Sequence, residues 1–400
     1  MKKVKLIMLT AMLCCVFGGS GIINHKKQQN VGVSSLNTVL ASANPEIQTN
    51  AKAVYLMDFY TKSVVYAHQE TKRLPIASMC KIMTLLLSFE AIDEGRLSIE
   101  EEISISERAA SMGGSQVFLE ANAKYKAREL IKSIVVCSAN DSCVAMAERI
   151  AGSESLFVEK MNERAKELGA DNTLFANCTG LPKEPQYSCA KDVALMLKAL
   201  LNHEEYYDFG KVWLDKFQHP EGRFTEITNT NKLIRFYDGC DGGKTGFTNE
   251  AGFCLAATAK RDNMRLISVV IGEESSDKRF QDVRTMFDYG FANYTAISVV
   301  EKEAVLTEVA KISGGKTDVL KVYPKRHSYA FVRRGANVNI STDIRFDKIK
   351  APIIKGEKVG ELIVYRDGVE FDCVDLLAAE PVEKANFFDC LGGIAREWNK

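Results

Sequence analysis

The chain has 400 residues, of which 46% are hydrophobic and 26% charged, and its formal net charge is zero. This length exceeds one average domain and favours two, and the composition is typical of soluble globular proteins. A nucleic-acid-binding protein would normally carry a basic excess or stripe for the phosphates. The sequence has neither, so we expect no nucleic-acid partner.

The N-terminus has the pattern of an export signal. Lys2, Lys3 and Lys5 precede a mostly apolar stretch over residues 6–23, which is the order found in secretory signals. Residues 41–43 read Ala-Ser-Ala, a small-residue cleavage pattern. Two alternatives stay open for residues 1–43: a signal peptide that is removed, or an N-terminal anchor that is kept. With either one, we expect an exported protein at the outer face of the cytoplasmic membrane or in the cell wall.

The first predicted elements after a polar linker over residues 25–50 are strands. Residues 53–57 and 63–67 predict two strands with a turn between them, and an apolar helix begins near Ser78 and runs through Phe89. The later elements up to residue 295 are a mostly helical region over 127–150, helices over 155–168, 192–201 and 278–289, and a hairpin over 252–260 and 264–272. We therefore predict an α+β domain over residues 44–295, with one antiparallel sheet covered by helices.

A different pattern begins at about residue 296. Short β-rich segments separated by turn residues predict a small all-β domain over residues 296–383. These segments are 298–305, 321–323, 329–332, 338–340, 358–365 and 369–374. In residues 384–400, apolar side chains recur at helical spacing and predict an amphipathic helix. This helix suits either a membrane surface or a docking site on the β domain, and both interpretations stay open.

The cysteines are numerous for an exported chain. Eleven are present, and the nine outside the N-terminal apolar stretch are an odd number that cannot all pair internally. We favour buried free thiols that pack as small apolar side chains over a disulfide framework. The nine are Cys80, Cys137, Cys143, Cys178, Cys189, Cys240, Cys254, Cys373 and Cys390.

Ser78 and Lys81 form an S-x-x-K motif at the start of the predicted apolar helix. A serine hydroxyl needs a base within hydrogen-bond reach to act as a nucleophile, and residues three apart on a helix share a face. Lys81 can be that base only if burial or nearby positive charge lowers its pKa. The apolar neighbours of the motif favour this over a chance pair on an exposed face.

A second motif, S-x-N, follows at Ser138 and Asn140. It falls at a predicted loop or helix end, where Ser138 can relay a proton and the Asn140 amide can contact a ligand. Alone, the motif is equally well explained as an ordinary polar cap.

The third motif, K-T-G, spans Lys244, Thr245 and Gly246. As an edge strand it would pair with an extended peptide. Lys244 supplies charge, Thr245 meets a terminal carboxylate, and Gly246 permits close approach of the ligand. The N–H groups of Ser78 and Phe247 would form an oxyanion hole. Alone, the motif is better explained as a glycine-rich turn before a hairpin.

Together and in this order, the three motifs resemble the signatures of the penicillin-interacting serine enzymes. Residues 74–84, 177–181, 188–192 and 241–248 are similar to the corresponding blocks of low-molecular-mass penicillin-binding proteins of the D-alanyl-D-alanine carboxypeptidase type, peptidase family S11. The similarity covers roughly residues 50–295, and the β domain and tail fit the family's layout.

The resemblance implies a β-lactamase/transpeptidase-like fold and a reaction. Ser78 would attack the carbonyl between the two terminal D-alanines of a peptidoglycan stem peptide, D-alanine would leave, and water would hydrolyse the acyl-enzyme. β-Lactams would acylate the same serine. The implied catalytic residues are Ser78, Lys81 and Ser138, and the implied substrate-binding residues are Asn140, Lys244, Thr245, Gly246, Phe247 and Arg279, the last for the substrate carboxylate. No metal or cofactor is implied, and a membrane surface is a partner through either terminus.

Two other functions share the motifs. A class A-like β-lactamase would need a glutamate between the second and third motifs; Glu184 lies there, but its surroundings fit the carboxypeptidase pattern, and the added β domain argues against a lactamase. A non-catalytic peptidoglycan- or β-lactam-sensing module would be acylated without releasing D-alanine.

Overall fold

The computed structural model describes residues 47–387 and 389. The predicted signal or anchor over residues 1–43 and most of the predicted tail helix over 384–400 therefore lie outside the described residues. Among the residues that are described, no helix is both long and apolar enough to cross a bilayer.

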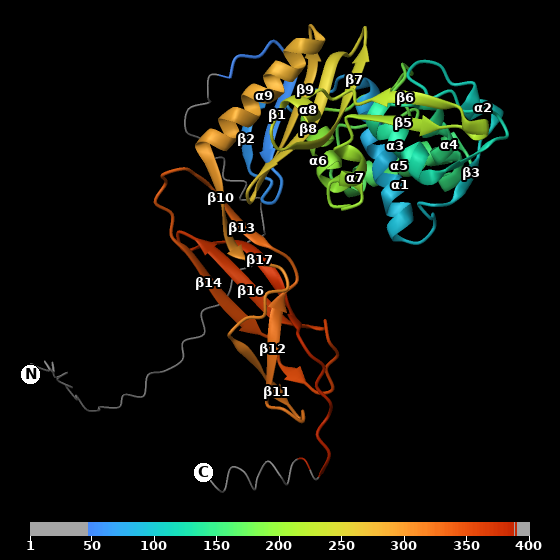
Figure 1. Ribbon diagram of the computed structural model, residues 1–400. Helices are drawn as coiled ribbons and strands as arrows, with labels where there is room; N and C mark the ends of the chain where they lie inside the picture. The colour runs from blue at the N-terminus through green and yellow to red at the C-terminus, as the bar shows by residue number, and fades with distance from the viewer. Residues whose placement is uncertain (1–46, 388, 390–400) are drawn as a thin grey trace, which may run out of the picture. The chain divides into compact units, whose positions relative to one another are not determined.

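A five-stranded antiparallel sheet forms the centre of the first part of the chain (Figure 1). Its strand order is β2-β1-β9-β8-β7, so that β7 lies at one edge. The strands are β1 (Ala53–Asp58), β2 (Val64–His68), β7 (Cys240–Thr248), β8 (Gly252–Arg261) and β9 (Met264–Glu273). The predicted strand pair at 53–67 and the hairpin at 252–272 are confirmed, and so is the edge position of the K-T-G strand.

Helices cover both faces of this sheet, and for this reason the central strands β1 and β9 are buried on both faces. In β1, Tyr55 and Met57 belong to one core, while Val54 and Leu56 belong to the other, as the two-residue period of a strand requires. The second core is closed by α9 (Ser276–Asn293). The first core packs against α1 (Lys81–Asp93), α3 (Ala127–Cys137), α4 (Asn140–Ala151), α5 (Glu154–Glu167) and α6 (Ala190–Leu200). The predicted antiparallel sheet covered by helices is confirmed.

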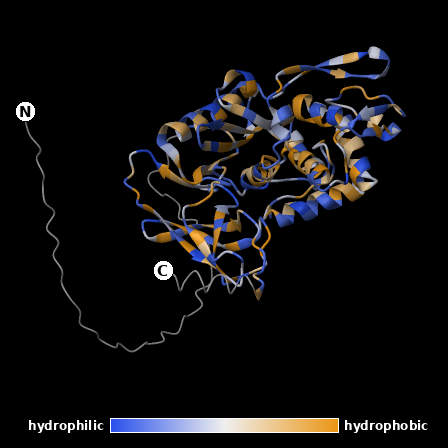
Figure 2. Cartoon of the chain, turned by 60° about the horizontal axis from the view of Figure 1, so that its bottom comes forward, coloured by the Kyte–Doolittle hydropathy of each residue, from blue (hydrophilic) through white to orange (hydrophobic). Residues whose placement is uncertain are grey.

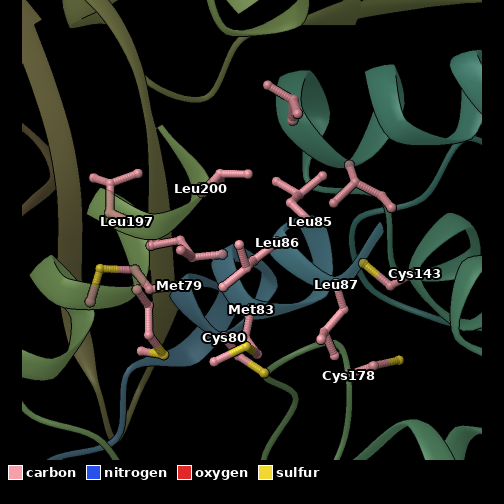
Figure 3. Close-up of a cluster of buried hydrophobic side chains, with 14 of the residues drawn as sticks. Met79, Cys80, Met83, Leu85, Leu86, Leu87, Cys143, Cys178, Leu197 and Leu200 are labelled. Carbon is pink, nitrogen blue, oxygen red and sulfur yellow. The ribbon is translucent and has the colours of Figure 1, made fainter. Parts of the chain in front are cut away.

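Helix α1 is the most enclosed element of the first core. Every residue from Lys81 through Phe89 is buried, as its apolar sequence predicts. Its neighbours include Leu197 and Leu200 of α6 (Figure 3). Figure 2 shows the contrast with the periphery, where hydrophobic and hydrophilic residues alternate around the outer helices. A polar side chain on α1 is therefore held in a water-poor environment.

Shorter elements connect these layers. They are the 3₁₀ helices η1 (Ala77–Cys80) and η2 (Pro220–Gly222), the helices α2 (Glu107–Ala110), α7 (Tyr206–Gly210) and α8 (Leu233–Phe236), and two antiparallel strand pairs, β3 (Glu102–Ser104) with β4 (Lys124–Lys126) and β5 (Leu214–Gln218) with β6 (Phe224–Thr228). Neither strand pair was predicted.

The C-terminal part is all β, as predicted. β10 (Tyr294–Val300) pairs with β13 (Ser328–Arg333), and a six-stranded sheet has the order β14-β16-β17-β12-β11-β15. The members of that sheet are β11 (Val309–Ser313), β12 (Val319–Pro324), β14 (Ile340–Phe346), β15 (Ile349–Lys350), β16 (Lys358–Arg366) and β17 (Val369–Ala378). They enclose their own hydrophobic core. The strand predicted at 338–340 was misplaced, because β14 begins only at Ile340.

The described cysteines are free thiols, and most are buried. Cys80, Cys143, Cys178, Cys189, Cys240 and Cys254 are buried, and Cys137 is half-buried. The predicted packing as small apolar groups is thus confirmed for these residues. The prediction is wrong for Cys373, which is exposed on β17, and Cys390 lies outside the described residues.

A pair of carboxyl groups, Asp282 on α9 and Glu273 at the end of β9, gives the fold a pH dependence. Asp282 shares the Thr49 hydroxyl with buried Glu273, and burial followed by the neighbouring carboxyl raises the pKa of Asp282 to about 7. A folded-state pKa above the unfolded one favours the folded state at low pH, and this contribution is lost as pH rises through about 7. We expect the melting temperature of Asp282→Asn to fall less than that of the wild type between pH 6 and pH 8. Thermal unfolding at both pH values checks this, with exposed Asp277→Asn on the same helix as the control. Equal pH dependence in wild type and Asp282→Asn would contradict it.

Candidate active site

Ser78 lies in the 3₁₀ turn η1 that leads into α1, one turn before the α-helix begins. The sequence placed it on the helix itself. In a 3₁₀ turn, residues three apart are eclipsed, and Nζ of Lys81 is accordingly 2.9 Å from Oγ of Ser78. The preceding residue, Ala77, has a left-handed φ of 47°, a strained conformation for a residue with a Cβ and one found most often at functional sites.

Lys81 is fully buried, and its Nζ also donates to the carbonyl of Thr179 at 2.6 Å. Burial lowers the pKa of Lys81 below its ordinary value, because a charged ammonium loses its hydration in this environment. Lys81 therefore has the lowered pKa that a base acting on Ser78 requires. Cys80, Cys143 and Cys178 belong to the same core (Figure 3) and lie near enough to Lys81 to interact with its charge. Burial raises the pKa of each of these thiols, which keeps them in the weakly nucleophilic thiol form.

The segment from Asn177 to Gly180 forms a cradle beneath the nucleophile. Oδ1 of Asn177 accepts from the N–H of Gly180 at 2.7 Å and of Thr179 at 3.1 Å, as in an Asx turn. This turn directs consecutive carbonyls at α1: Thr84 donates to that of residue 178, and Lys81 to that of Thr179. Every residue has a main-chain carbonyl, so no residue type marks this role in the sequence. The segment was singled out only because it is similar to the corresponding block of the S11 carboxypeptidases.

Ser138 is the residue at which the predicted helical region breaks. It caps α3 with a left-handed φ of 66°, so it stands at a helix end as expected. Its Oγ is buried and has no hydrogen-bond partner among the described residues. Asn140 follows at the start of α4; its Nδ2 donates to the carbonyl of Gly113 at 2.7 Å, whereas its buried Oδ1 has no partner in the described part of the chain. Both atoms are free to meet a ligand.

Asp141, next to Asn140, organises the loop that crosses this end of α4. Its carboxylate accepts from the N–H groups of Val117 and Leu119, each at 3.1 Å, and from that of Ser142. Asp141 is buried, so these bonds offset the cost of burying its charge. Sequence reasoning missed this residue.

Strand β7 carries Lys244 and Thr245 of the third motif. Lys244 is buried, and its pKa is lowered by burial and then by the charge of Lys81. The Thr245 hydroxyl donates to that of Thr230 at 2.8 Å, and the Thr230 N–H donates to the carbonyl of Val136 on α3 at 3.0 Å. Thr230 thus joins the third motif to helix α3, which ends at the second motif. No local pattern in the sequence predicts this link.

The protein's own backbone gives Gly246 a second reason to be glycine, beside the predicted approach of a ligand. A Cβ on this residue would lie 2.6 Å from the carbonyl oxygen of Ile76 and 3.2 Å from the backbone nitrogen of Ser78. The group that approaches Gly246 closely is η1, the turn that carries Ser78. This packing places the backbone nitrogen of Ser78 beside β7. The N–H of Phe247, the next residue on β7, is the second predicted donor of the oxyanion hole, and its ring is exposed.

We expect Gly246→Ala to lower the rate of acylation by a fluorescent penicillin about 100-fold, because a displacement of about 1 Å at a reacting centre has an effect of this size. The new methyl group would force η1 and β7 apart. Gly113→Ala is the matched control, since a Cβ there meets nothing within 4 Å although the residue contacts Asn140. Acylation of Gly246→Ala at the wild-type rate would refute this reading of the glycine.

Arg279, in the first turns of α9, reaches the end of the same strand. Its guanidinium donates to the carbonyls of Gly246 at 3.1 Å and Cys254 at 3.2 Å, and its Nε has no partner among the described residues. Burial lowers the pKa of Arg279 to about 10, so the side chain stays charged at neutral pH. Glu184, which a class A-like lactamase would use, is exposed and forms no hydrogen bond or ion pair in the described part of the chain.

Comparisons with known proteins identify the family of the chain. The family model of D-alanyl-D-alanine carboxypeptidases, peptidase S11, matches residues 38–275, and that of the penicillin-binding protein 5 C-terminal domain matches residues 294–384. D-alanyl-D-alanine carboxypeptidase DacF of Bacillus subtilis is 39% identical over 89% of this chain and 92% of its own length. DacC of Escherichia coli is 30% identical over 85% of this chain and 86% of its own length.

A solved structure gives the same result. The crystal structure of penicillin-binding protein 5 from Haemophilus influenzae superposes with a TM-score of 0.66 and 27% identity, covering 84% of this chain and 98% of that one. The predicted fold and the predicted family are therefore confirmed. The chain belongs to the D-alanyl-D-alanine carboxypeptidases of peptidase family S11 and carries the C-terminal domain of penicillin-binding protein 5.

Proposed function

We propose that this protein removes the terminal D-alanine from peptidoglycan stem peptides that end in D-Ala-D-Ala, through an acyl-enzyme on Ser78. The observation that carries the proposal is the 2.9 Å contact between Oγ of Ser78 and Nζ of a fully buried lysine. A neutral amine at that position can accept the hydroxyl proton.

The acylation step follows from this contact. Oγ of Ser78 attacks the carbonyl carbon of the penultimate D-alanine while Lys81 takes the hydroxyl proton. The N–H groups of Ser78 and Phe247 stabilise the oxyanion that forms. The peptide C–N bond then breaks, and the departing amine of D-alanine takes a proton delivered through Ser138, whose hydroxyl is otherwise unpartnered among the described residues. In the second half, water attacks the ester and frees Ser78, with the same groups moving the proton.

Strand β7 positions the substrate in our proposal. The stem peptide adds to the edge of the sheet as an extra strand, with the Asn140 amide on its backbone. Its terminal carboxylate lies near Thr245, beside the charged guanidinium of Arg279 and the buried amine of Lys244. A β-lactam presents an amide to the same serine, and its ring holds the leaving nitrogen in place after the bond breaks, so the ester is long-lived.

The location and division of the chain are also proposals. We place the peptidase domain at residues 44–295 and the β domain at 296–383, and we infer export through residues 1–43 to the outer face of the cytoplasmic membrane or the cell wall. The amphipathic pattern of residues 384–400 supports attachment to the membrane surface. Deleting residues 384–400 should remove the protein from the membrane fraction and leave D-alanine release unchanged; retention in the membrane would point to the N-terminal segment instead.

Release of D-alanine from diacetyl-Lys-D-Ala-D-Ala tests the proposed activity. We expect catalytic turnover by the purified protein, with many D-alanine molecules released per enzyme. A folded protein that binds penicillin covalently but releases no D-alanine would favour the sensing module, and rapid turnover of penicillin itself would favour the β-lactamase.

A further inference from the structure

The segment over residues 175–181 is held by side chains instead of a backbone ladder. Its seven consecutive backbone N–H groups all donate to side-chain oxygens, and none donates to a backbone carbonyl among the described residues. No helix or strand includes these residues. The side chains that accept therefore determine where the carbonyls of the segment point. They belong to Asn162, Gln186, Glu154, Asn177 and Thr179.

One peptide bond of this segment lies between Asn177 and Lys81. Its carbonyl, that of Thr179, accepts from Nζ of Lys81 at 2.6 Å. Its N–H, that of Gly180, donates to Oδ1 of Asn177 at 2.7 Å. The bond is trans and planar, so its N–H and C=O point in opposite directions. Asn177 therefore holds one end of the plane while the lysine is bound at the other.

The other polar contacts of Asn177 belong to the same turn. Oδ1 also accepts from the N–H and the hydroxyl of Thr179, each at 3.1 Å, and Nδ2 donates to the carbonyl of Leu181 at 2.8 Å. The side chain is buried, so its loss would leave backbone N–H groups without a partner. In the described part of the chain, Asn177 has no hydrogen bond to Ser78 or Lys81, and it acts on them only through Thr179.

We propose that Asn177 is a positioning residue for the reaction: its turn orients the Thr179 carbonyl, which directs the amine of Lys81 at Oγ of Ser78. The inference rests on the proposed function, in which Lys81 is the base. A neutral amine has two N–H groups and one lone pair. When the carbonyl accepts from one N–H, the lone pair can face the serine hydroxyl. Without that hydrogen bond Nζ is free to rotate, and proton transfer loses its alignment.

The same carbonyl affects the basicity of Lys81. A carbonyl binds an ammonium more strongly than a neutral amine, so it favours the charged form and opposes the effect of burial on the pKa. The other titratable groups that face Lys81 are four thiols, whose pKa values are raised by burial, and one amine, whose pKa is lowered by burial. They are Cys80 of η1, Cys137 of α3, Cys143 of α4, Cys178 of the segment and Lys244 of β7.

Asn177→Ala in the purified full chain tests the proposal. The rate of acylation by a fluorescent penicillin would be measured between about pH 5 and pH 10. We expect the plateau rate at high pH to fall by up to about 100-fold, the effect of a displacement of about 1 Å at a reacting centre. The midpoint of the rise with pH should move to lower pH, because the ammonium loses an acceptor. An unchanged midpoint would overturn the proposal, since a general loosening of the fold lowers the rate without moving it.

Asn177→Asp is the conservative variant. Aspartate forms the same turn as asparagine, so the plateau rate should return to within about tenfold of the wild type. The negative charge favours the ammonium of Lys81, and the midpoint should therefore move to higher pH, in the direction opposite to that of Asn177→Ala. This variant decides the matter if Asn177→Ala does not fold. A plateau below about a tenth of the wild-type rate, or no upward shift, would overturn the proposal.

The matched control is Asn162→Ala on α5. Asn162 binds the N–H of Phe175 at 2.8 Å and its carbonyl at 2.9 Å, so it holds the same segment, but none of its hydrogen bonds in the described chain reaches Asn177. Its melting temperature should fall while its plateau rate and midpoint stay those of the wild type. A midpoint that moves as in Asn177→Ala would overturn the assignment to Asn177. A wild type that penicillin does not label would overturn the proposed function itself.

Discussion

Ser78→Ala should abolish D-alanine release and covalent labelling by a fluorescent penicillin, with a loss of at least about 10³-fold in each rate, because no other group can form the ester. The only hydrogen bond of the Ser78 hydroxyl in the described residues is the one from Lys81. Since Ser78 is only half-buried, the loss of one oxygen should leave the melting temperature within a few degrees of the wild type.

The control for this variant is Ser155→Ala, which removes a serine hydroxyl from an exposed position on α5. It should label and turn over like the wild type. Residual labelling of a folded Ser78→Ala at more than about a hundredth of the wild-type rate would mean that another nucleophile, such as Ser138, accepts the acyl group.

Lys81→Met should lower the acylation rate by at least about 10³-fold, an effect in the range expected when a general base is lost. Methionine is similar in length, so it fills the buried space while removing the amine. It also removes the free-energy cost of burying an amine that is protonated in the unfolded chain, so the melting temperature should stay the same or rise. If the acylation rate of Lys81→Met falls while its melting temperature does not, Lys81 acts as the base and does not merely support the fold.

The matched control is Lys198→Met on α6. Burial lowers the pKa of Lys198 as it does that of Lys81, but its Nζ lies over the Phe59 ring at 4.7 Å and not at a serine. This variant should acylate at the wild-type rate. A Lys81→Met protein that acylates within tenfold of the wild type would remove Lys81 from the mechanism.

The pH dependence of acylation gives an independent check on Lys81. Only the neutral amine accepts a proton, and the folded-state pKa of Lys81 is lowered by burial. The acylation rate should therefore rise with pH through that lowered pKa and level off below the ordinary lysine value of 10.5. The residual acylation rate of Lys81→Met should not show this rise with pH.

The elements predicted correctly from the sequence are mainly those with a long hydrophobic pattern. Strands β1, β8 and β9 and helix α1 contain long apolar runs and were found, whereas β7 was found through its K-T-G motif. β5 and β14 were missed or misplaced because their side chains are mostly exposed: in β5 only Phe217 is buried, and in β14 none is. A strand without a buried face has no alternation to detect.

The candidate site divides in a similar way. Ser78, Lys81 and Thr245 were found because their chemistry requires a particular residue type at a particular spacing. Thr179 contributes a carbonyl, which every residue has, and Thr230 acts through a contact between segments distant in sequence. For Gly246 the sequence predicted close approach of a ligand, but not the closeness of Ile76, which depends on how η1 packs against β7. Such contacts follow from tertiary structure and leave no local pattern.

The most direct test of the Ser78 acyl-enzyme is to locate the ester. The full chain would be quenched with acid during turnover of diacetyl-Lys-D-Ala-D-Ala, digested with trypsin and analysed by tandem mass spectrometry. We predict the diacetyl-lysyl-D-alanyl mass on the peptide of residues 74–81, with fragment ions placing it on Ser78, the only serine in that peptide. The same acyl mass on Cys80 or on the peptide that contains Ser138 would contradict it.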